Sequence, residues 1–368
     1  MSKVNLHDTV TINELRTLIP VIGTELTPIV QSEPGCGKTS LLSMISLDNG
    51  DQWRKVGDYF ESDKYDYIYV DCPVKDMADI GMTIPNHANK SLEYYVSSLF
   101  MLDSPKPKVI LLDEFMKAPK LLQVIFTRLM LERTVGDRPL DAKDAPIKSI
   151  VFGTSNNASD GVGDGMLAHA GNRVCKIQMS KPDADMWCTW ATTNKIARPI
   201  RAWVTMNPKV MYSYLDPNQE DNEYIFKPSK TGQFASPRSL AKADVIVRNR
   251  DKMGENGTKV ALAGTIGASA AADMSAFLSL EKTLSDFKDI IKDPLSVDVP
   301  KEISAQLMLM FQAIDTMDTQ DHLTKFMQFV ERIKSSEVQS VFFTMMMRNQ
   351  RTLRLARNNQ KKIGRAHV

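Results

Sequence analysis

The stretch QSEPGCGKTSLL, from Gln31 to Leu42, constrains the fold of this chain more than any other. A short apolar run, TPIVQS, leads into it, and SLLSMISL, which has helical spacing, follows it. The pattern is close to G-x-x-x-x-G-K-[ST], but Ser32 stands where the strict pattern has glycine. We expect a small residue to be accepted there if its backbone dihedral angles are ordinary. The stretch therefore predicts a phosphate-binding loop between a β-strand and a helix.

Each residue type in this loop has a physical role at such a site. Glycines let the backbone curl closely around phosphate oxygens, because no Cβ intrudes, and the N–H groups at a helix start attract anions. Lys38 is expected to reach the β- and γ-phosphates, and the Thr39 hydroxyl to ligate Mg²⁺. The alternative is a plain glycine-rich turn before a helix. The predicted nucleotide-binding residues of the loop are Glu33, Pro34, Gly35, Cys36, Gly37, Lys38, Thr39 and Ser40.

A pair of acids ends a second apolar run, VILLDE. Asp113, at the end of the predicted strand, is placed to hold Mg²⁺ together with Thr39, and Glu114 to polarise the attacking water as a general base. The alternative is an acidic strand end that begins a loop. Because the loop and the acidic pair occur in the right order, on strands predicted to be adjacent, we favour a magnesium–nucleotide site.

Two further polar groups end predicted strands. KSIVFGTSN finishes with Thr154, Ser155 and Asn156, where a polar side chain is placed to touch the γ-phosphate or the attacking water, unless this is simply a polar turn. Asp71, which ends the strand in YDYIYVDCP, is a candidate for sensing nucleotide and restraining Glu114.

Strands and helices alternate in the first half of the chain. The predicted strands are TPIVQS, YDYIYVDCP, KVILLDE, KSIVFGTSN and NRVCKIQM, and the predicted helices are TINELRTLI, SLLSMISL, SLEYYVSSLFML and APKLLQVIFTRLMLE. This alternation predicts a five-stranded parallel sheet covered by helices. After about Lys181 the patterns are helical, with Trp and Met on the apolar faces. We predict an α/β nucleotide-binding core at 1–180, a helical region at 181–293 and a helical C-terminal extension at 294–362.

Composition excludes several classes of protein. The net charge of +2, from 46 basic and 44 acidic residues, is too balanced to indicate nucleic-acid binding by the whole chain. The four cysteines form no C-x-x-C pair, which argues against a zinc site or a disulfide framework. No apolar run is long enough to span a membrane, and MSKVNLHDTV lacks an apolar signal core. We therefore expect a cytoplasmic protein.

The C-terminal region raises two separate questions. The stretch RNQRTLRLARNNQKK contains no acid, and four arginines recur at every third residue: Arg348, Arg351, Arg354 and Arg357. A basic helix of this kind is a nucleic-acid footprint, a partner contact or, as we favour, a solvated helix. The final hexapeptide IGRAHV, at 363–368, is also what a widely used sequencing-adapter DNA encodes in one frame. We expect an artefact of that DNA or an ordinary tail, and exclude it from fold reasoning.

Six stretches between about Ile12 and Leu280 together resemble the MoxR branch of the AAA+ ATPases, especially its bacteriophage-type members. They are SEPGCGKT (Walker A), VILLDEFMKAPKLLQ (Walker B and the next helix), GTSNNASDGVGDGMLAHAGNRV (sensor 1), DADMWCTWA (start of the lid), FASPRSLAKAD (sensor 2) and AGTIGASAAADMSAFLSL (late lid helix). The resemblance implies an AAA+ P-loop NTPase core followed by an all-α lid, which would be the region 181–293. The C-terminal extension has no counterpart in the family pattern.

The resemblance also implies roles for single residues. Asn156 takes the place of the sensor 1 residue, Arg173 in GNRV that of an arginine finger, and Arg238 in SPRSL that of sensor 2. An arginine that neutralises charge on the γ-phosphate is physically reasonable, and a surface salt bridge is the alternative for each. Val174 departs from the phenylalanine that more commonly follows the arginine finger. KDMADIGMTIP falls where the family has a loop near the ring's pore or its partner-facing surface.

The activity implied is Mg²⁺-dependent ATP hydrolysis by a homo-oligomeric ring, expected to be hexameric, that remodels or assembles a protein partner as a chaperone does. The family's usual partner is a von Willebrand factor A domain protein, and a phage-encoded chain would act in the cytoplasm of a bacterial host. Two alternatives stay open. One is a nucleic-acid motor or helicase loader in phage replication, supported by the basic tail alone, and the other is a nucleotide-gated scaffold with little turnover.

Overall fold

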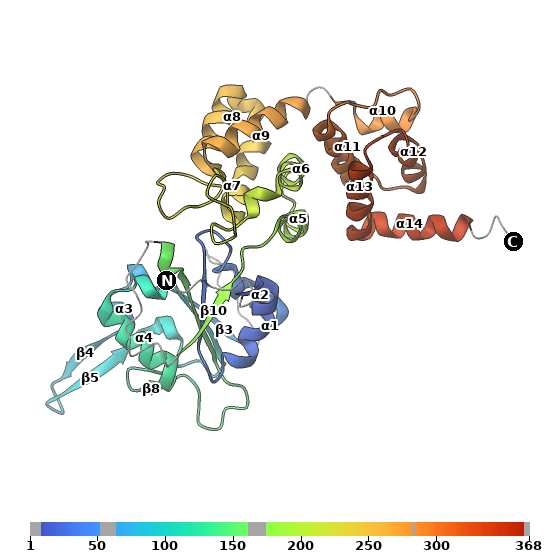
Figure 1. Cartoon of the computed structure of the whole chain (residues 1–368). Helices are drawn as coiled ribbons and strands as arrows, with labels where there is room; N and C mark the ends of the chain where they lie inside the picture. Colours follow the sequence, from blue (N-terminus) through green and yellow to red (C-terminus); the bar gives the residue numbers. More distant parts are fainter. Residues whose placement is uncertain (1–8, 52–63, 161–173, 282–283, 364–368) are drawn as a thin grey trace. The chain divides into compact units, whose positions relative to one another are not determined.

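The computed structural model describes residues 9–51, 64–160, 174–281 and 284–363. The chain divides into two compact units, which we describe separately (Figure 1). The first unit is Met1–Pro182 with Leu215–Pro217 and Phe226–Thr231. The second unit is Asp183–Tyr214, Asn218–Ile225 and Gly232–Val368. The finer scheme, with boundaries after residues 180 and 293, stays a prediction.

The first unit is built on a parallel sheet with six strands in the order β1-β10-β2-β9-β6-β3. These strands are β1 (Thr9–Val10), β2 (Pro28–Ser32), β3 (Asp66–Asp71), β6 (Lys108–Asp113), β9 (Ile150–Asn156) and β10 (Cys175–Met179). The five strands expected from the sequence are all present. The prediction of a five-stranded sheet is nevertheless wrong by one strand, because β1 is two residues long and has no pattern of its own.

The strand order corrects a second expectation. Strand β2, which leads into the phosphate loop, and β6, which ends at Asp113, are not adjacent, because β9 lies between them and pairs with both. Side chains from three neighbouring strand ends therefore meet, with those of β9 in the middle. A central strand that runs into a glycine-rich loop and helix, flanked on both sides by later strands, is the arrangement of the predicted AAA+ P-loop core.

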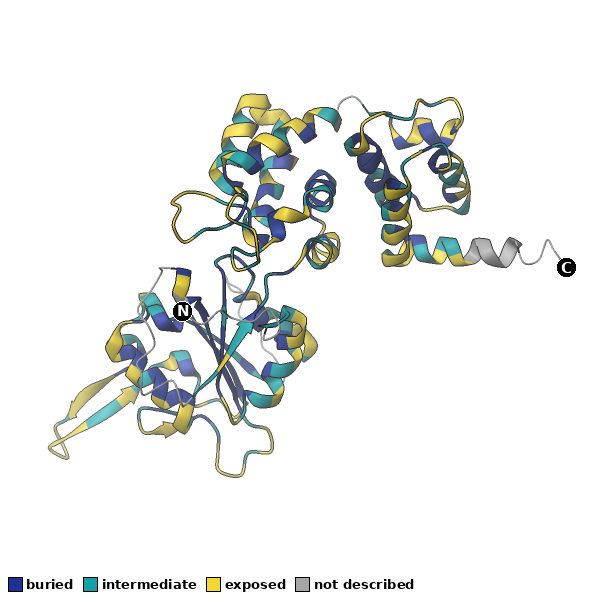
Figure 2. Cartoon of the chain, in the orientation of Figure 1, coloured by how far each residue is buried: buried dark blue, intermediate teal, exposed yellow. Residues whose placement is uncertain are grey.

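Helices cover both faces of this sheet, and its central strands β2, β9 and β6 are almost entirely buried (Figure 2). On one face lie α1 (Ile12–Ile22) and α2 (Ser40–Asp48), and on the other lies α4 (Lys120–Glu132). The packing alternates along each strand. Val30 of β2 packs with the α1 and α2 side, and its neighbour Ile29 packs with the α4 side. Burial on both faces explains why these strands are continuous apolar runs in the sequence.

A two-stranded antiparallel ribbon projects from the first unit (Figure 1). It consists of β4 (Gly81–Asn86) and β5 (Ser91–Val96), and follows the short helix α3 (Met77–Ile80). The helix predicted for SLEYYVSSLFML is therefore wrong. Alternate side chains of β5 face opposite sides, so that Tyr94 packs against Gly136 in the turn between β7 (Thr134–Val135) and β8 (Arg138–Pro139).

The outer face of the ribbon is apolar. Met82 lies opposite Tyr95 in the antiparallel register, and Ile84 follows on the same face. All three side chains are exposed, as is Met77 just before the ribbon. Within KDMADIGMTIP, Met77, Met82 and Ile84 are therefore exposed, whereas Ile80 is buried.

The second unit is helical. Its helices are α5 (Ala184–Thr193), α6 (Arg198–Met206), α7 (Pro237–Arg248), α8 (Arg250–Ile266), α9 (Ala268–Glu281), α10 (Phe287–Lys292), α11 (Ile303–Thr316), α12 (Gln320–Val330), α13 (Ser336–Arg348) and α14 (Gln350–Ile363). One apolar cluster surrounds Trp187 and Trp203, and another surrounds Phe326 and Phe342. No helix within the described residues is both long and apolar enough to cross a membrane.

Candidate nucleotide-binding site

The backbone of the loop after β2 has the conformation that its glycines were expected to provide. Gly35 and Gly37 have φ angles of 80° and 96°, in the region that favours glycine. Ser32 is the last residue of β2, has no positive φ, and pairs in register with Asn156 of β9. Serine in place of the usual glycine therefore causes no backbone strain, as the sequence argument required.

The ammonium group of Lys38 lies inside this loop. Its Nζ donates to the carbonyl oxygens of Ser32 (2.8 Å) and Glu33 (2.9 Å), and to Oδ1 of Asn156 (3.1 Å). The Ser32 hydroxyl is a further acceptor at 3.2 Å. Lys38 is only 7% exposed. The structure therefore brings together the predicted phosphate-binding lysine and the predicted sensor 1 residue, which are 118 residues apart in the chain.

Asp113 is the second centre of the site. Its carboxylate accepts hydrogen bonds from three hydroxyl groups: Thr39 at 3.1 and 3.3 Å, Tyr69 at 2.8 Å, and Thr154. Asp113 is 6% exposed. Burial, together with the negative charge of Asp113, raises the pKa of Tyr69, so this phenol stays protonated and remains a donor. The predicted metal ligands, Thr39 and Asp113, are thus in direct contact.

Glu114, the predicted general base, is held differently. Its backbone is in the left-handed region, with φ 51° and ψ 37°, which is uncommon outside glycine. Its N–H donates to the hydroxyl of Thr154 at 3.2 Å. Its carboxylate accepts a hydrogen bond from Lys117 Nζ at 2.6 Å. Among the described residues, the hydrogen bond to this carboxylate comes from Lys117, and the role suggested for Asp71 stays a prediction.

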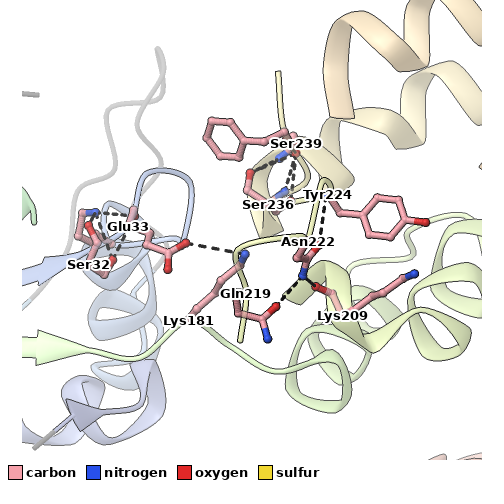
Figure 3. Close-up of polar contacts among 11 residues, drawn as sticks. Ser32, Glu33, Lys181, Lys209, Gln219, Asn222, Tyr224, Ser236 and Ser239 are labelled. Atoms are coloured by element: carbon pink, nitrogen blue, oxygen red, sulfur yellow. Dashed lines mark hydrogen bonds and ion pairs between the residues drawn. The ribbon is translucent and has the colours of Figure 1, made fainter. Parts of the chain in front are cut away.

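A buried ion pair lies behind the loop. Glu33 Oε2 is 3.8 Å from Lys181 Nζ, and the two side chains are 4% and 3% exposed (Figure 3). Lys181 lies just beyond the end of β10. Cys36 in the same loop is also buried. Burial and the nearby charge of Glu33 raise the pKa of the Cys36 thiol to about 11.

The remaining predicted loop residues occupy ordinary positions. Ser40 is the first residue of α2, and its N–H donates to the Gly37 carbonyl at 2.9 Å. Pro34 is half-buried. Next to Asn156, the Asn157 side chain accepts a hydrogen bond from Gln178 of β10 at 3.0 Å. Because β2 lies between β9 and β10, this bond crosses the base of the phosphate loop.

Two predicted arginines lie outside the described part of the first unit. Arg173 lies in 161–173, outside the described residues. Arg238 is the exposed second residue of α7, in the second unit. The start of that helix is fixed by a capping box between Ser236 and Ser239 (Figure 3). The roles of both arginines toward nucleotide stay predictions.

Sequence reasoning assigned no role to several side chains that the structure places in the site. Tyr69 and Lys181 carry no motif, and only the fold brings them to Asp113 and Glu33. Lys117 stands three residues after Glu114, a spacing that allows an ion pair if the segment turns, so a signal was present.

Two of the four tail arginines are used within the second unit. Arg348 forms an ion pair with Asp185 at 3.1 Å. Arg351 donates to the carbonyl oxygens of Ile314 (2.9 Å) and Asp315 (2.6 Å), at the end of α11. Because two of the four arginines contact the second unit itself, fewer of them are available to bind nucleic acid than the sequence indicated. Residues 364–368, most of the final hexapeptide, lie outside the described residues.

Comparison with known proteins gives only distant similarities. No family model and no curated protein matches the chain. It is similar to the RuvB Holliday junction branch migration motor of Thermotoga maritima, at 12% identity and a TM-score of 0.35, over 80% of this chain and 78% of that one. It is also similar to a "putative ATPase" of Cytophaga hutchinsonii, at 13% identity and a TM-score of 0.33, over 91% and 81% of the two chains. Because these TM-scores are low, the fold assignment rests on the chain's own strand order and loop geometry.

Proposed function

We propose that this chain is a Mg²⁺-dependent ATPase of the AAA+ type. One observation carries the proposal: Lys38 contacts Asn156 while Thr39 contacts Asp113, so that a glycine-rich loop, a buried acid and a polar strand end converge at three neighbouring strand ends. A structural turn with no ligand has no need to bury a lysine and an aspartate at such a place, because burying charges is costly.

The residues present fit a magnesium–nucleotide complex. Mg²⁺ prefers oxygen ligands and is commonly held by one or two protein oxygens together with phosphate oxygens. The Thr39 hydroxyl and the Asp113 carboxylate are such a pair. When bound, Mg²⁺ neutralises charge on the β- and γ-phosphates. The acceptors that surround Lys38 are carbonyl, hydroxyl and amide oxygens, which a phosphate oxygen can replace.

The chain's own groups have distinct parts in the proposed reaction. Lys38 and the N–H groups at the start of α2 bind and orient the phosphates. Asn156 orients the γ-phosphate or the attacking water through its amide. Glu114 accepts a proton from that water. Arg173, supplied to a neighbouring subunit's site, and Arg238 would stabilise charge in the transition state, as the family resemblance implies.

We further propose that the protein works as a homo-oligomeric ring, hexameric in the related family, that remodels a protein partner. The exposed apolar face of the β4–β5 ribbon, with Met82, Ile84 and Tyr95, is a surface that suits protein contact. The family resemblance suggests a von Willebrand factor A domain protein as that partner. Ring formation would be measured by light scattering with and without ATP.

The direct test is phosphate release from ATP with and without Mg²⁺. We expect Glu114→Gln to reduce kcat by about 10²- to 10⁴-fold while nucleotide affinity is kept. Lys38→Ala should instead weaken nucleotide binding itself. If wild-type protein releases no phosphate under any condition but binds ATP, the scaffold alternative is correct. Stimulation by DNA and not by protein would support a nucleic-acid motor.

A further inference from the structure

Each oxygen of the Asp113 carboxylate accepts a hydrogen bond from a different neighbouring strand. Oδ1 accepts from the hydroxyl of Thr154 on β9, and Oδ2 accepts from the hydroxyl of Tyr69 on β3 at 2.8 Å. The Thr39 hydroxyl, from the phosphate loop, lies within reach of both oxygens, at 3.3 Å from Oδ1 and 3.1 Å from Oδ2. Because β6 lies between β9 and β3, the carboxylate is held from both sides.

The three hydroxyl groups differ in their relation to the proposed metal. Thr39 is itself a proposed ligand of Mg²⁺, so its contact with Asp113 is part of the metal site. Tyr69 and Thr154 are not proposed ligands, and they contact the metal-binding carboxylate only through hydrogen bonds. These two donors can therefore fix the plane of the carboxylate without contacting the ion.

The position of Tyr69 makes it a rigid donor. Its strand pairs with β6 in parallel register, with Tyr69 opposite Leu111 and Asp71 opposite Asp113. The Tyr69 side chain is half-buried and packs against the apolar cluster beneath α1 and α2. A tyrosine side chain has only two dihedral angles, so a packed ring holds its hydroxyl in place at little cost in conformational entropy.

We propose that Tyr69 is a positioning residue that orients the Asp113 carboxylate and makes the site prefer Mg²⁺ to Ca²⁺. This inference rests on the proposed ATPase function. Replacing a group that hydrogen-bonds to a metal ligand commonly lowers metal affinity by about 10- to 100-fold. Mg²⁺ demands near-ideal octahedral geometry, whereas Ca²⁺ accepts flexible sets of oxygen ligands. A fixed carboxylate therefore favours Mg²⁺, and a carboxylate that is free to rotate loses that preference.

The test measures metal binding separately from turnover. Calorimetry gives the affinity of the full chain for the non-hydrolysable analogue AMP-PNP in EDTA, in Mg²⁺ and in Ca²⁺. The affinity with each metal, divided by the affinity in EDTA, is the contribution of that metal to binding. For Tyr69→Phe we expect the Mg²⁺ contribution to fall about tenfold and the Ca²⁺ contribution to fall by less than about threefold, while the affinity in EDTA is unchanged. Tyr69→Leu also lacks the hydroxyl and should show the same pattern, so the test does not depend on the packing of one variant.

Tyr67 provides a matched control. It lies on the same strand as Tyr69 and packs against the same apolar cluster. Its hydroxyl donates to Oδ2 of Asp51, an acid outside the proposed site, at 2.7 Å. Tyr67→Phe therefore removes an equivalent hydrogen bond to a carboxylate, and we expect all three affinities to stay at the wild-type value.

An unchanged Mg²⁺ contribution in both Tyr69→Phe and Tyr69→Leu overturns the inference, and so does an equal loss for Mg²⁺ and Ca²⁺. Failure of the proposed function gives a different result, because the wild-type chain would then bind no AMP-PNP, or would bind it equally well in Mg²⁺ and in EDTA. If the wild-type chain binds AMP-PNP more tightly with Mg²⁺ and hydrolyses ATP, the ATPase assignment holds whatever Tyr69 does.

Discussion

The hydroxyl of Thr154, at the end of β9, donates a hydrogen bond to the carboxylate of Asp113, at the end of neighbouring β6. The same hydroxyl accepts a hydrogen bond from the N–H of Glu114. One side chain thus connects the proposed metal ligand to the backbone of the proposed base. Thr154 belongs to β9, which lies between β2, the strand that leads into the phosphate loop, and β6, the strand that ends at the acidic pair.

Replacing Thr154 by Val tests this connection. The substitution keeps the shape of the side chain, removes one of the hydrogen bonds to Asp113 and takes away the acceptor of the Glu114 N–H, which costs about 1–3 kcal/mol of unfolding free energy. Loss of orientation should lower kcat by about 10- to 100-fold. Urea unfolding and phosphate release measure the two effects. Thr134→Val is the control, because the buried Thr134 hydroxyl has no partner among the described residues. It should change stability by less than about 0.5 kcal/mol.

The Glu33–Lys181 pair gives a second prediction. Lys181→Met leaves the Glu33 carboxylate buried without its cation, and should lower the unfolding free energy by about 3 kcal/mol. Glu33→Gln together with Lys181→Met should recover part of that loss. Lys75 and Asp79 have the same 3.8 Å separation but are far more exposed, so Lys75→Met should cost under about 1 kcal/mol. Equal losses for Lys181→Met and Lys75→Met would show that burial does not matter here.

The raised pKa of Cys36 predicts an alkaline loss of stability. The ordinary thiol pKa is 9.0, and the folded value is about 11. Between these values the unfolded chain has lost this proton and the folded chain keeps it, so the unfolding free energy falls as pH rises. Cys36→Ala removes this contribution. Its urea midpoint should therefore fall less steeply than that of wild type from about pH 9 to pH 11.

Gly37→Ala tests the conformation of the phosphate loop. At φ 96° an added Cβ costs roughly 1–2 kcal/mol, and nucleotide affinity should fall with the distorted loop. Gly264, in the helix α8, has open space where a Cβ would lie. Gly264→Ala should stabilise the protein by about 0.5–1 kcal/mol and leave affinity unchanged. Calorimetric binding of ATP and thermal unfolding distinguish the two variants.

The sequence predicted the elements of the site because their signals are local. Each of the five predicted strands is rich in apolar or aromatic residues, and the glycines of the loop stand at the positions where positive φ is observed. The lysine, the acids and the polar strand end were therefore all identified before the structure. Their roles in catalysis stay predictions until activity is measured.

The order of the strands and the partners between them could not be predicted in the same way. The strands that end at the phosphate loop and at the acidic pair were expected to be neighbours. In the sheet, β9 lies between them, because parallel strands are joined by crossover connections that do not fix which strands pair. Tyr69 reaches Asp113 through that order alone. SLEYYVSSLFML has apolar residues at both helical and strand spacing, so the sequence predicts a helix where the structure has a strand that pairs with β4 and packs Tyr94 against Gly136.

Pro85 makes the β4–β5 ribbon less prone to aggregation than its exposed apolar face would suggest. Proline has no backbone N–H and is confined to the borders of sheets. Pro85 offers no N–H to a third strand laid along β4, which disfavours edge-to-edge pairing of ribbons from separate molecules. The ribbon can thus expose apolar side chains without favouring aggregation through its strand edge.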